Sequence, residues 1–405
     1  MSRRKRWRNV KGRESRVTEP RERLMSVGGS LGAHLVAPFL SRGSEDVPRD
    51  ILILRLDRIG DVLMSLPAIR ALRDAAPKAR IRLAVGEWSH EIARDAAVDE
   101  VLLWSAPWVG RSDEGALSVR EVFTKARALR GAPPDLAIDL QGDVRALWLM
   151  AATGALTRVG YANTGSAALL TEIVELNEDV NCVEQNYRAI EKALGVTVPR
   201  NPFRWIDGDG RVRGRQRMAA SLSEAGIQRR GPLVGLHPGA GRSIKEWPIE
   251  RFVELGRRLV HEKSATLVLT GSAGEAGKTA AIRRALPEAT LDFAGKLTLA
   301  GSAEMMTACD AFVSCDTSAM HFACAMGVPS VAIFGPSDAG RYFSGGASGF
   351  NSGRRHVALS PELWCSPCNL IRRPPEECDA LPSPECLTLI TTETVFAATL
   401  SVLGS

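Results

Sequence analysis

Two kinds of apolar pattern alternate along most of this chain. The run ILIL at residues 51–54 is short and continuously apolar, which is typical of a strand buried in a sheet. In the segment after it, apolar side chains recur every three or four residues, which predicts a helix: Val62, Leu66, Ile69 and Leu72. Because strand and helix patterns go on alternating, we predict a parallel sheet with helices on both faces.

The alternation occurs twice, with a break in between. The break at residues 198–216 is rich in Pro, Gly and charge, and we interpret it as a linker. Further strand patterns lie on both sides of it, at residues 81–86, 100–104, 135–142, 157–162, 232–239, 265–272, 291–295, 310–315 and 329–338. The pattern predicts an α/β protein with two Rossmann-like, doubly wound domains, at residues 49–210 and 211–405, after a tail of residues 1–48. Two such domains leave a cleft beside the carboxyl ends of their strands, where a nucleotide and a second substrate bind.

Composition and charge narrow the class of protein. The 405 residues are 45% hydrophobic and 24% charged, as in soluble globular proteins. The net charge is +6, but residues 1–30 hold ten basic and three acidic side chains, a balance of +7 that leaves −1 for the rest. Since the basic charge belongs to a tail and not to the folded body, we expect no nucleic-acid partner.

The basic tail has two interpretations. We expect it to be disordered, because it is too polar to pack into a core. It either draws the protein to anionic lipid headgroups, at about 1 kcal/mol per basic residue near the surface, or is a solvated extension from an inaccurate start codon. The apolar stretch at residues 27–40 is too short and glycine-rich to span a bilayer and has no clear signal-peptide cleavage site. We therefore expect a cytoplasmic protein, peripheral on the inner membrane if the tail binds lipid.

A Gly-Asp pair, Gly60-Asp61, lies where the first strand pattern turns into a helix. The carboxylate of Asp61 has a structural reading, because Asp is favoured near helix amino termini. It also has a chemical reading, because open α/β folds bind ligands at the carboxyl ends of their strands. The stretch by itself leaves both readings open.

Two turns in the second half have the features of anion sites. In HPGAGRSIKEWP, at residues 237–248, small residues allow backbone amides to approach an anion that Lys245 could neutralise. In CDTSAMH, Asp316 and Thr317 lie between a strand and a helix whose amino terminus attracts phosphate, and His321 follows on the same helical face. The alternatives are a tight turn with an exposed lysine and a simple helix cap.

A third stretch, LTGSAGEAGKTAA at residues 269–281, imitates a P-loop. The motif G-x-x-x-x-G-K-[ST] requires a glycine at position 272, where this chain has Ser272, and Gly271 comes one residue early. Without that spacing the usual phosphate-binding nest of backbone amides does not form. The pattern therefore disfavours a P-loop ATPase or kinase, which we keep as an alternative function.

The ordered set of these motifs resembles the bacterial lipopolysaccharide heptosyltransferases of glycosyltransferase family 9. The matching stretches are RLDRIGDVLMSLPAIRAL, HPGAGRSIKEWP, LTGSAGE, FAGKLTL and CDTSAMHFACAMGVPSVAIFGPSD, which span roughly residues 50 to 390. The resemblance implies a GT-B architecture, two Rossmann-like domains facing a central cleft. It also implies inverting transfer of a sugar, typically heptose from ADP-heptose, onto a lipopolysaccharide-core or related glycan, with no metal or other cofactor required. A second alternative is a paralogue that binds nucleotide-sugar without catalysis.

The resemblance also implies roles for particular residues. Asp61 corresponds to the general base that removes the acceptor hydroxyl's proton. The residues that correspond to donor-binding positions are Lys245, Asp316 and Thr317 for the diphosphate, Glu275 for the nucleoside, Leu297 for the adenine, and His321. This chain departs from the family in having Ser318-Ala319 where Gly-Pro is common.

Four cysteines gather near the carboxyl terminus: Cys365, Cys368, Cys378 and Cys386. A C-x2-C pair followed by two more cysteines can hold zinc tetrahedrally. The second pair has the spacing C-x7-C, which is irregular for a zinc knuckle. In a cytoplasmic protein we therefore favour reduced structural thiols and keep zinc as the alternative.

Overall fold

The computed structural model describes residues 48–109, 117–206, 208–347, 355–371, 374, 378 and 381–404. The predicted tail, apart from Pro48, lies outside the described residues. The chain divides into two compact units between Asn201 and Pro202, here called unit 1 and unit 2. The domain boundary expected after residue 210 falls within the first helix of unit 2, Gly208–Glu224.

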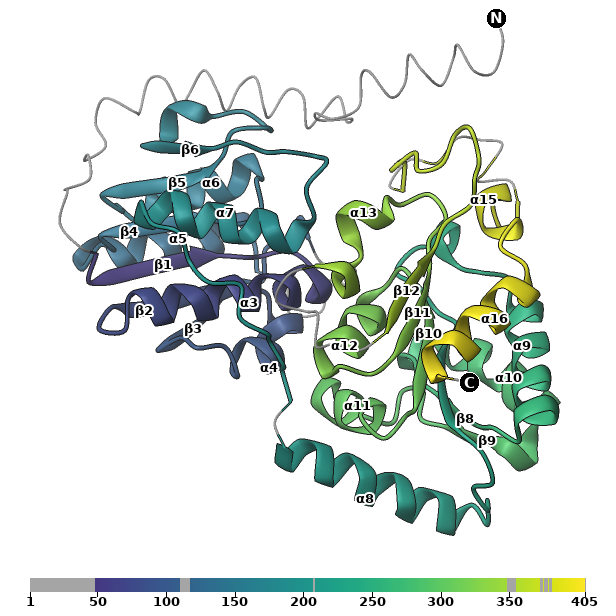
Figure 1. Ribbon diagram of the computed structural model, residues 1–405. Helices are drawn as coiled ribbons and strands as arrows, with labels where there is room; N and C mark the ends of the chain where they lie inside the picture. The colour runs from purple at the N-terminus through teal and green to yellow at the C-terminus, as the bar shows by residue number, and fades with distance from the viewer. Residues whose placement is uncertain are drawn as a thin grey trace, which may run out of the picture. The chain divides into compact units, whose positions relative to one another are not determined.

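Unit 1 is built on a six-stranded sheet in the order β3-β2-β1-β4-β5-β6, in which all neighbouring strands are parallel (Figure 1). Its strands are β1 (Asp50–Leu54), β2 (Arg80–Val85), β3 (Glu100–Leu103), β4 (Leu136–Asp139), β5 (Thr157–Tyr161) and β6 (Glu172–Val174). Its helices are α3 (Ile59–Ala75), α4 (His90–Ala93), α5 (Val119–Ala128), α6 (Val144–Ala152) and α7 (Cys182–Leu194), with 3-10 turns at Glu87–Ser89, Leu129–Gly131 and Ala167–Leu169.

Unit 2 repeats this design with the order β12-β11-β10-β7-β8-β9, again all parallel. Its strands are β7 (Leu233–His237), β8 (Thr266–Leu269), β9 (Thr290–Asp292), β10 (Ala311–Cys315), β11 (Ser330–Ile333) and β12 (His356–Leu359). Its helices are α8 (Gly208–Glu224), α9 (Ile249–Lys263), α10 (Ala276–Ala285), α11 (Leu299–Met306), α12 (Ser318–Met326), α13 (Ala339–Tyr342), α15 (Glu385–Thr388) and α16 (Thr392–Leu403), with 3-10 turns at Ser243–Lys245, Ala273–Glu275, Pro287–Ala289 and Ser344–Gly346.

Numbered within its own unit, each sheet has the strand order 3-2-1-4-5-6 of a doubly wound fold. Successive strands are first added to one side of the sheet and then to the other. This switch lies between β1 and β4 in unit 1, and between β7 and β10 in unit 2. Ligands of such folds bind at this switch point, beyond the carboxyl ends of the strands. We call the side of each sheet where the strands end, at their carboxyl termini, the finishing edge. The opposite side, where the strands begin, is the starting edge. The predicted pair of doubly wound sheets is confirmed.

The central strands read as continuous apolar runs because helices cover both of their faces. All four residues of the ILIL run in β1 are fully buried. Leu52 and Leu54 pack with side chains of α5 and α6. In unit 2, Val234 and Leu236 of β7 pack with side chains of α9, α10 and α16.

Helix α8 lies partly where the sequence predicted a linker, and tertiary contacts explain the difference. Gly214 lets α8 approach α11 so closely that a Cβ there would lie 1.9 Å from the carbonyl oxygen of Glu304. The Glu304 carboxylate also pairs with Arg213 at 2.7 Å and with Arg217 at 3.7 Å. Glycine and arginine, which looked like linker composition, therefore form a helix that is fixed to unit 2.

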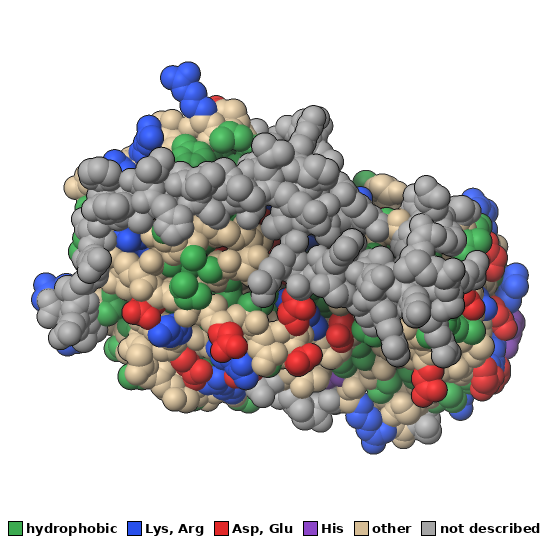
Figure 2. Space-filling view, turned by 90° about the horizontal axis from the view of Figure 1, so that it is seen from above, with side chains coloured by type: hydrophobic (Ala, Val, Ile, Leu, Met, Phe, Trp, Pro, Cys, Tyr) green, Lys and Arg blue, Asp and Glu red, His purple; other side chains and the backbone are tan. Residues whose placement is uncertain are grey.

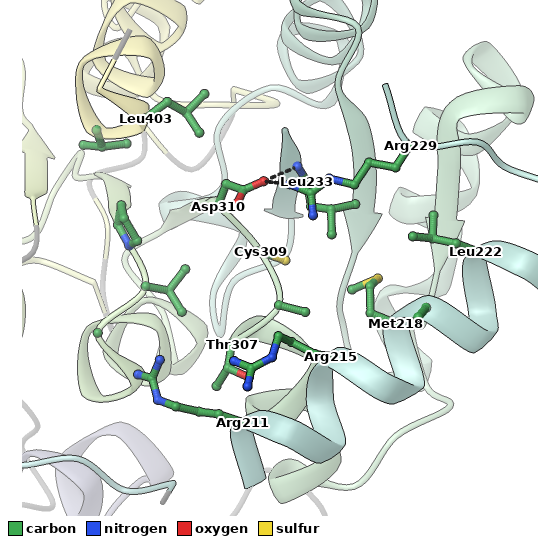
Figure 3. A pocket seen from close by; sticks show the side chains of 16 residues that line it. Arg211, Arg215, Met218, Leu222, Arg229, Leu233, Thr307, Cys309, Asp310 and Leu403 are labelled. Atoms are coloured by element: carbon green, nitrogen blue, oxygen red, sulfur yellow. Dashed lines mark hydrogen bonds and ion pairs between the residues drawn. The ribbon is translucent and has the colours of Figure 1, made fainter. Parts of the chain in front are cut away.

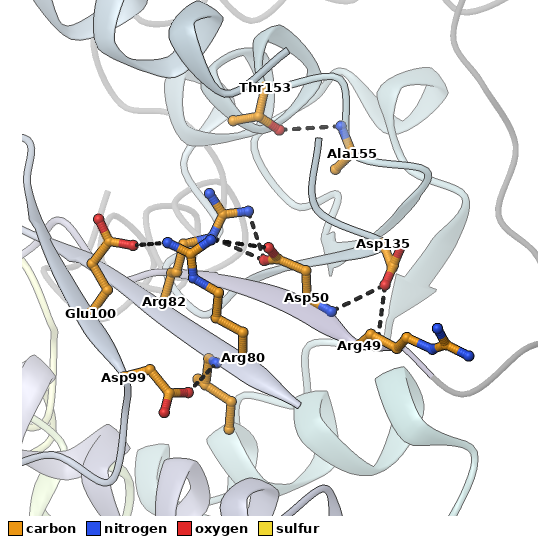
Figure 4. A network of polar contacts seen from close by, with 10 residues as sticks. Arg49, Asp50, Arg80, Arg82, Asp99, Glu100, Asp135, Thr153 and Ala155 are labelled. Carbon is orange, nitrogen blue, oxygen red and sulfur yellow. Dashed lines mark hydrogen bonds and ion pairs between the residues drawn. The ribbon is translucent and has the colours of Figure 1, made fainter. Parts of the chain in front are cut away.

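Charged side chains join the strands at the starting edge of the unit 1 sheet (Figure 4). The Asp50 carboxylate accepts from Arg82 at 2.9 and 2.6 Å, and Arg80 pairs with Glu100 at 2.7 Å. The Asp135 carboxylate accepts the backbone N–H groups of Arg49 and Asp50. These contacts tie the beginnings of β1, β2, β3 and β4 together.

The starting edge of the unit 2 sheet borders a cavity of about 660 Å³ (Figure 3). Its walls include α8, the residues before β7, β10 and β11, and the end of α16. Two of its arginines already have partners: Arg211 donates to the carbonyl oxygen of Met326, and Arg229 pairs with Asp310 at 2.6 Å. This cavity is remote from the finishing edge, where ligands of this fold bind.

Acidic and basic side chains are interspersed over the described part of the face in Figure 2, in keeping with the charge of −1 outside residues 1–30. Among the described helices, none combines the length and the apolar composition needed to cross a membrane.

Candidate functional site

Asp61 lies at the finishing edge of unit 1, in the first turn of α3 beyond the end of β1. It does not cap the helix, because the N-cap position belongs to Arg58, whose side chain makes no capping hydrogen bond. The Asp61 side chain is about one-third exposed, and its Oδ1 lies 3.8 Å from Nη2 of Arg55. Asp61 is therefore not the cap itself, but its place in the first turn still suits the helix dipole, and its carboxylate is accessible to solvent at the switch point of the sheet.

Arg55, which sequence reasoning missed, organises this turn from within. Its guanidinium is 5% exposed and donates through Nε to the carbonyl oxygen of Asp61 at 3.2 Å. It pairs with Oδ1 of Asp57 at 3.2 Å and donates to the carbonyl oxygen of Leu140, just after β4. One buried cation thus joins β1, β4 and the start of α3.

Two further carboxylates share the field of Arg55. Burial raises the pKa of Asp57 to about 7, although Arg55 opposes the shift. Burial also raises the pKa of Asp139, at the end of β4, to about 7, against the hydrogen bonds that it accepts from the N–H groups of Gln141 and Gly142. The only sequence signal for these groups was their position directly after apolar strand patterns.

Four of the positions singled out in unit 2 lie in the segments that follow strands, which places them at one finishing edge. Lys245 ends the 3-10 turn after β7, and Glu275 ends the one after β8. Leu297 comes after β9 and is half-buried, and Asp316 directly follows β10. The sequence motifs therefore mark one edge of one sheet.

Lys245 and Asp316 meet directly, with Nζ 2.6 Å from Oδ2 and both side chains largely buried. Trp247 fixes the loop that carries Lys245: its N–H donates to Sγ of Cys315 at 3.3 Å and its Nε1 to the carbonyl oxygen of Ile390 at 2.8 Å. The loop is therefore held against β10, and the ammonium group is presented beside the start of α12.

Thr317 is the N-cap residue of α12, but its side chain makes no capping hydrogen bond. The amino terminus of this nine-residue helix therefore keeps N–H donors and a positive dipole end beside Lys245. His321 lies further along α12, is 5% exposed, and its Nδ1 is 3.0 Å from Oγ of Ser344. His321 thus packs inside unit 2 behind the amino end of α12.

Glu275 is fixed by a capping box with Ser272, whose N–H and hydroxyl donate to its Oε2 at 2.7 and 2.8 Å. Its Oε1 lies 4.0 Å from Nε2 of His237, and a Cβ on residue 239 would lie 2.0 Å from Oε1, so a larger residue than Gly239 would displace the Glu275 carboxylate. Burial would raise the pKa of Glu275, but His237 and the bonds from Ser272 hold it below its usual range. Glu275 is therefore an ionised hydrogen-bond acceptor that lies beside Gly239, in the loop that follows β7.

The P-loop reading does not fit this geometry. Lys278 lies in α10 after a 3-10 turn, and its Nζ is 2.6 Å from Oε1 of Glu246. The hydroxyl of Thr279, which a P-loop would offer to a metal ion, is buried and bonded to Asp292 and to the carbonyl of Ala276. Lys278 and Thr279 therefore both contact partners within the protein.

The four cysteines come near one another in unit 2. Burial, together with the sulfurs of Cys368, Cys378 and Cys365, raises the pKa of the Cys386 thiol to about 12. Within the described residues no group of three or more His, Cys, Asp or Glu side chains is placed to hold a metal ion. Several neighbours of these cysteines lie outside the described residues, and both the thiol and the zinc interpretations stay predictions.

Comparison with known proteins gives a consistent assignment. The family model for glycosyltransferase family 9 (heptosyltransferase) matches residues 122–376, more than half of the chain. Lipopolysaccharide heptosyltransferase 1 of Pseudomonas aeruginosa is 26% identical over 324 residues, covering 78% of this chain and 85% of that protein.

Two solved structures share the fold of the chain. The family 9 glycosyltransferase of Veillonella parvula is 20% identical, covers 88% of this chain and 97% of its own, and gives a TM-score of 0.67. The Escherichia coli heptosyltransferase WaaC with ADP is 20% identical, covers 85% and 97%, and gives a TM-score of 0.61. At this identity the two structures bear on the fold, and the predicted α/β class of GT-B type agrees with them.

Proposed function

The chain belongs to glycosyltransferase family 9, and on that premise we propose that it transfers heptose from ADP-heptose onto a lipopolysaccharide-core or related glycan, with inversion at the anomeric carbon. The observation that carries the proposal is the buried Lys245–Asp316 pair beside the amino terminus of α12. A lysine held by a carboxylate at such a place can exchange that carboxylate for a diphosphate.

The donor is bound by unit 2 in this proposal. The diphosphate takes up the charge of Lys245 and hydrogen bonds from the N–H groups at Thr317 and the start of α12. Glu275 accepts hydrogen bonds from hydroxyls of the nucleoside, Leu297 packs against the adenine, and His321, a residue of α12, anchors that helix to Ser344. Because fixed cationic and amide groups neutralise the leaving ADP, the reaction requires no metal or other cofactor. The known complex of the related WaaC with ADP supports a nucleotide of this kind.

Asp61 acts as the general base. Its carboxylate takes the proton of the acceptor hydroxyl as that oxygen attacks the anomeric carbon. The bond from the anomeric carbon to the diphosphate oxygen breaks, and ADP leaves with the bonding electron pair. Attack from the side opposite the leaving group inverts the configuration. Arg55, which holds the Asp61 backbone, keeps the carboxylate oriented.

We also propose a cytoplasmic location with peripheral contact to the inner membrane. The acceptor of a lipopolysaccharide-core transferase is a glycolipid, so the enzyme works at a membrane surface. The balance of +7 within residues 1–30 supports attraction to anionic headgroups.

The decisive experiment incubates the full-length protein with ADP-heptose and a panel of truncated lipopolysaccharide cores, and detects product by mass spectrometry and its anomeric configuration by NMR. We expect one inverted heptosyl product that Asp61→Asn does not form. Binding of donor without turnover on any acceptor would favour a non-catalytic paralogue. Hydrolysis of ATP that Lys278→Ala abolishes would favour an NTPase instead.

A further inference from the structure

Lys278 and Glu246 form an ion pair at the finishing edge of unit 2 that the proposed chemistry does not use. The two atoms, Nζ and Oε1, lie 2.6 Å apart, and the residues come from different elements, α10 and the loop after β7. Glu246 directly follows Lys245 in the chain, so the pair adjoins the residue expected to hold the donor diphosphate.

Glu246 joins both ends of the loop that carries Lys245. Its Oε1 accepts the N–H of Ala240 at 3.3 Å, near the beginning of the loop, while its own backbone lies near the loop's end. Its carbonyl oxygen accepts from the hydroxyl of Ser383 at 3.4 Å. The position of this carboxylate is therefore coupled to the shape of the whole loop, and Lys278 is the cation that holds it.

The charge of Lys278 also reaches the other candidate donor residues. It lowers the pKa of both His237 and Glu275, after the larger effects of burial and of the charges that these two exert on each other. The ammonium group of Lys278 therefore contacts the loop of Lys245 through Glu246 and also acts electrostatically on the carboxylate of Glu275.

We propose that Lys278 is a positioning residue of the donor site: it binds the Glu246 carboxylate and so keeps that negative charge away from Lys245 and from the donor's diphosphate. The inference rests on the proposed function, because it assigns the pair to the same donor. Without Lys278, Glu246 becomes an alternative partner for the neighbouring Lys245 and repels an incoming anion. Lys278 thus acts through Glu246 and does not itself touch the reacting atoms.

The test uses five full-length variants, with ADP binding measured by calorimetry and donor KM and kcat measured by product formation. Lys278→Met should weaken ADP binding and raise donor KM about tenfold, equivalent to about 1.4 kcal/mol, with kcat within about twofold. Lys278→Arg should bind ADP nearly as the wild type does, since it keeps the cation. The double variant Lys278→Met/Glu246→Gln should recover most of the loss, because it has no carboxylate left to hold. Lys263→Met, which removes a lysine from the end of α9, is the matched control and should change neither value.

Rescue by Glu246→Gln is the result that a merely structural role would not produce. Wild-type ADP affinity in Lys278→Met, or no recovery in the double variant, overturns the proposal. If Lys278→Met does not fold, Glu246→Gln alone decides: ADP affinity equal to or tighter than wild type supports the proposal, and weaker affinity contradicts it. Because ADP binding is measured apart from turnover, failure of ADP-heptose as a substrate would count against the proposed function and leave this inference to stand or fall on the binding data.

Discussion

At the starting edge of the unit 1 sheet, Arg82 meets Asp50 at 2.6 Å in a direct pair that links β2 to β1. At the finishing edge of the same sheet, Arg55 faces three carboxylates, those of Asp57, Asp61 and Asp139, and burial raises the pKa of two of them to about 7. The starting edge balances its charges locally, whereas the finishing edge holds more acid than base.

In unit 2 the two edges differ in what their cations contact. At its starting edge, Arg211 and Arg229 are committed to the carbonyl oxygen of Met326 and to Asp310. At its finishing edge, Lys245 and Lys278 are held by carboxylates that belong to neighbouring loops. An ion pair that joins strands stabilises the fold, while a cation beside an open helix amino terminus can change partners when an anion arrives. The size of the cavity at the starting edge is therefore a poor guide to function here.

Removing the base should have the largest effect at the finishing edges. Asp61→Asn keeps the size of the side chain but cannot accept the proton, so we expect kcat to fall about 10²- to 10⁴-fold. ADP affinity should be unchanged, because the proposed nucleotide site lies in unit 2. Product formation under saturating donor gives the answer, and a kcat within threefold of wild type would exclude Asp61 as the base.

Removing the cation of the donor site should come next. Lys245→Met removes a charged hydrogen bond, which contributes about 1.5–3 kcal/mol, so ADP binding should weaken about 10- to 150-fold. The Asp316 carboxylate, left without its partner, adds repulsion. Calorimetric titration with ADP measures the loss, and an unchanged dissociation constant would move the diphosphate site away from this lysine.

A change at the starting edge of unit 1 should affect stability and leave activity alone. Arg82→Met removes the closer of the two arginines that pair with Asp50 and should lower the free energy of unfolding by about 1–3 kcal/mol. Donor KM and kcat at a temperature well below unfolding should match the wild type. A loss of kcat at such a temperature would contradict the separation between the two edges.

The smallest effect concerns pH. Because the pKa of Asp139 is raised to about 7 in the folded protein, the unfolded chain ionises first as pH rises, and stability falls between about pH 4 and 7. Asp139→Asn removes this contribution, so its stability relative to wild type should improve from pH 5 to pH 8 by at least about 1.4 kcal/mol, the equivalent of a single pKa unit. Urea unfolding at both pH values measures it, and parallel pH profiles would show that Asp139 is ionised throughout.

The strands and the turns that follow them were predictable from sequence for a simple reason. Both signals are local: a buried parallel strand is a continuous apolar run, and its finishing edge begins at the first polar residues afterwards. Asp61, Lys245 and Asp316 could be singled out on this basis. Their roles came from the resemblance, since a Gly-Asp pair or a lone lysine has several structural explanations.

The partnerships could not be predicted, because they join residues far apart in the chain. In the sequence, Lys278 belongs to a stretch that resembles a P-loop with the wrong glycine spacing. Only the structure shows that its partner is Glu246, 32 residues earlier. Arg55 joins β1 to β4 through its hydrogen bond to the carbonyl oxygen of Leu140, which lies 85 residues away in the chain. Helix α8 was missed for the same reason, since its glycines disfavour a helix unless α11 packs against them and Glu304 of α11 pairs with Arg213.

Helix α12 carries Thr317 at one end and the carbonyl of Met326 at the other, where Arg204 and Arg211 donate to it. Nine residues of α-helix span about 13 Å, so the two arginines restrain a helix whose opposite end carries the proposed diphosphate site. Strengthening or weakening the hydrogen bonds of these arginines to Met326 should change the mobility of α12. It should therefore change how much entropy is lost when the nucleotide binds, although the atoms that contact the nucleotide stay the same.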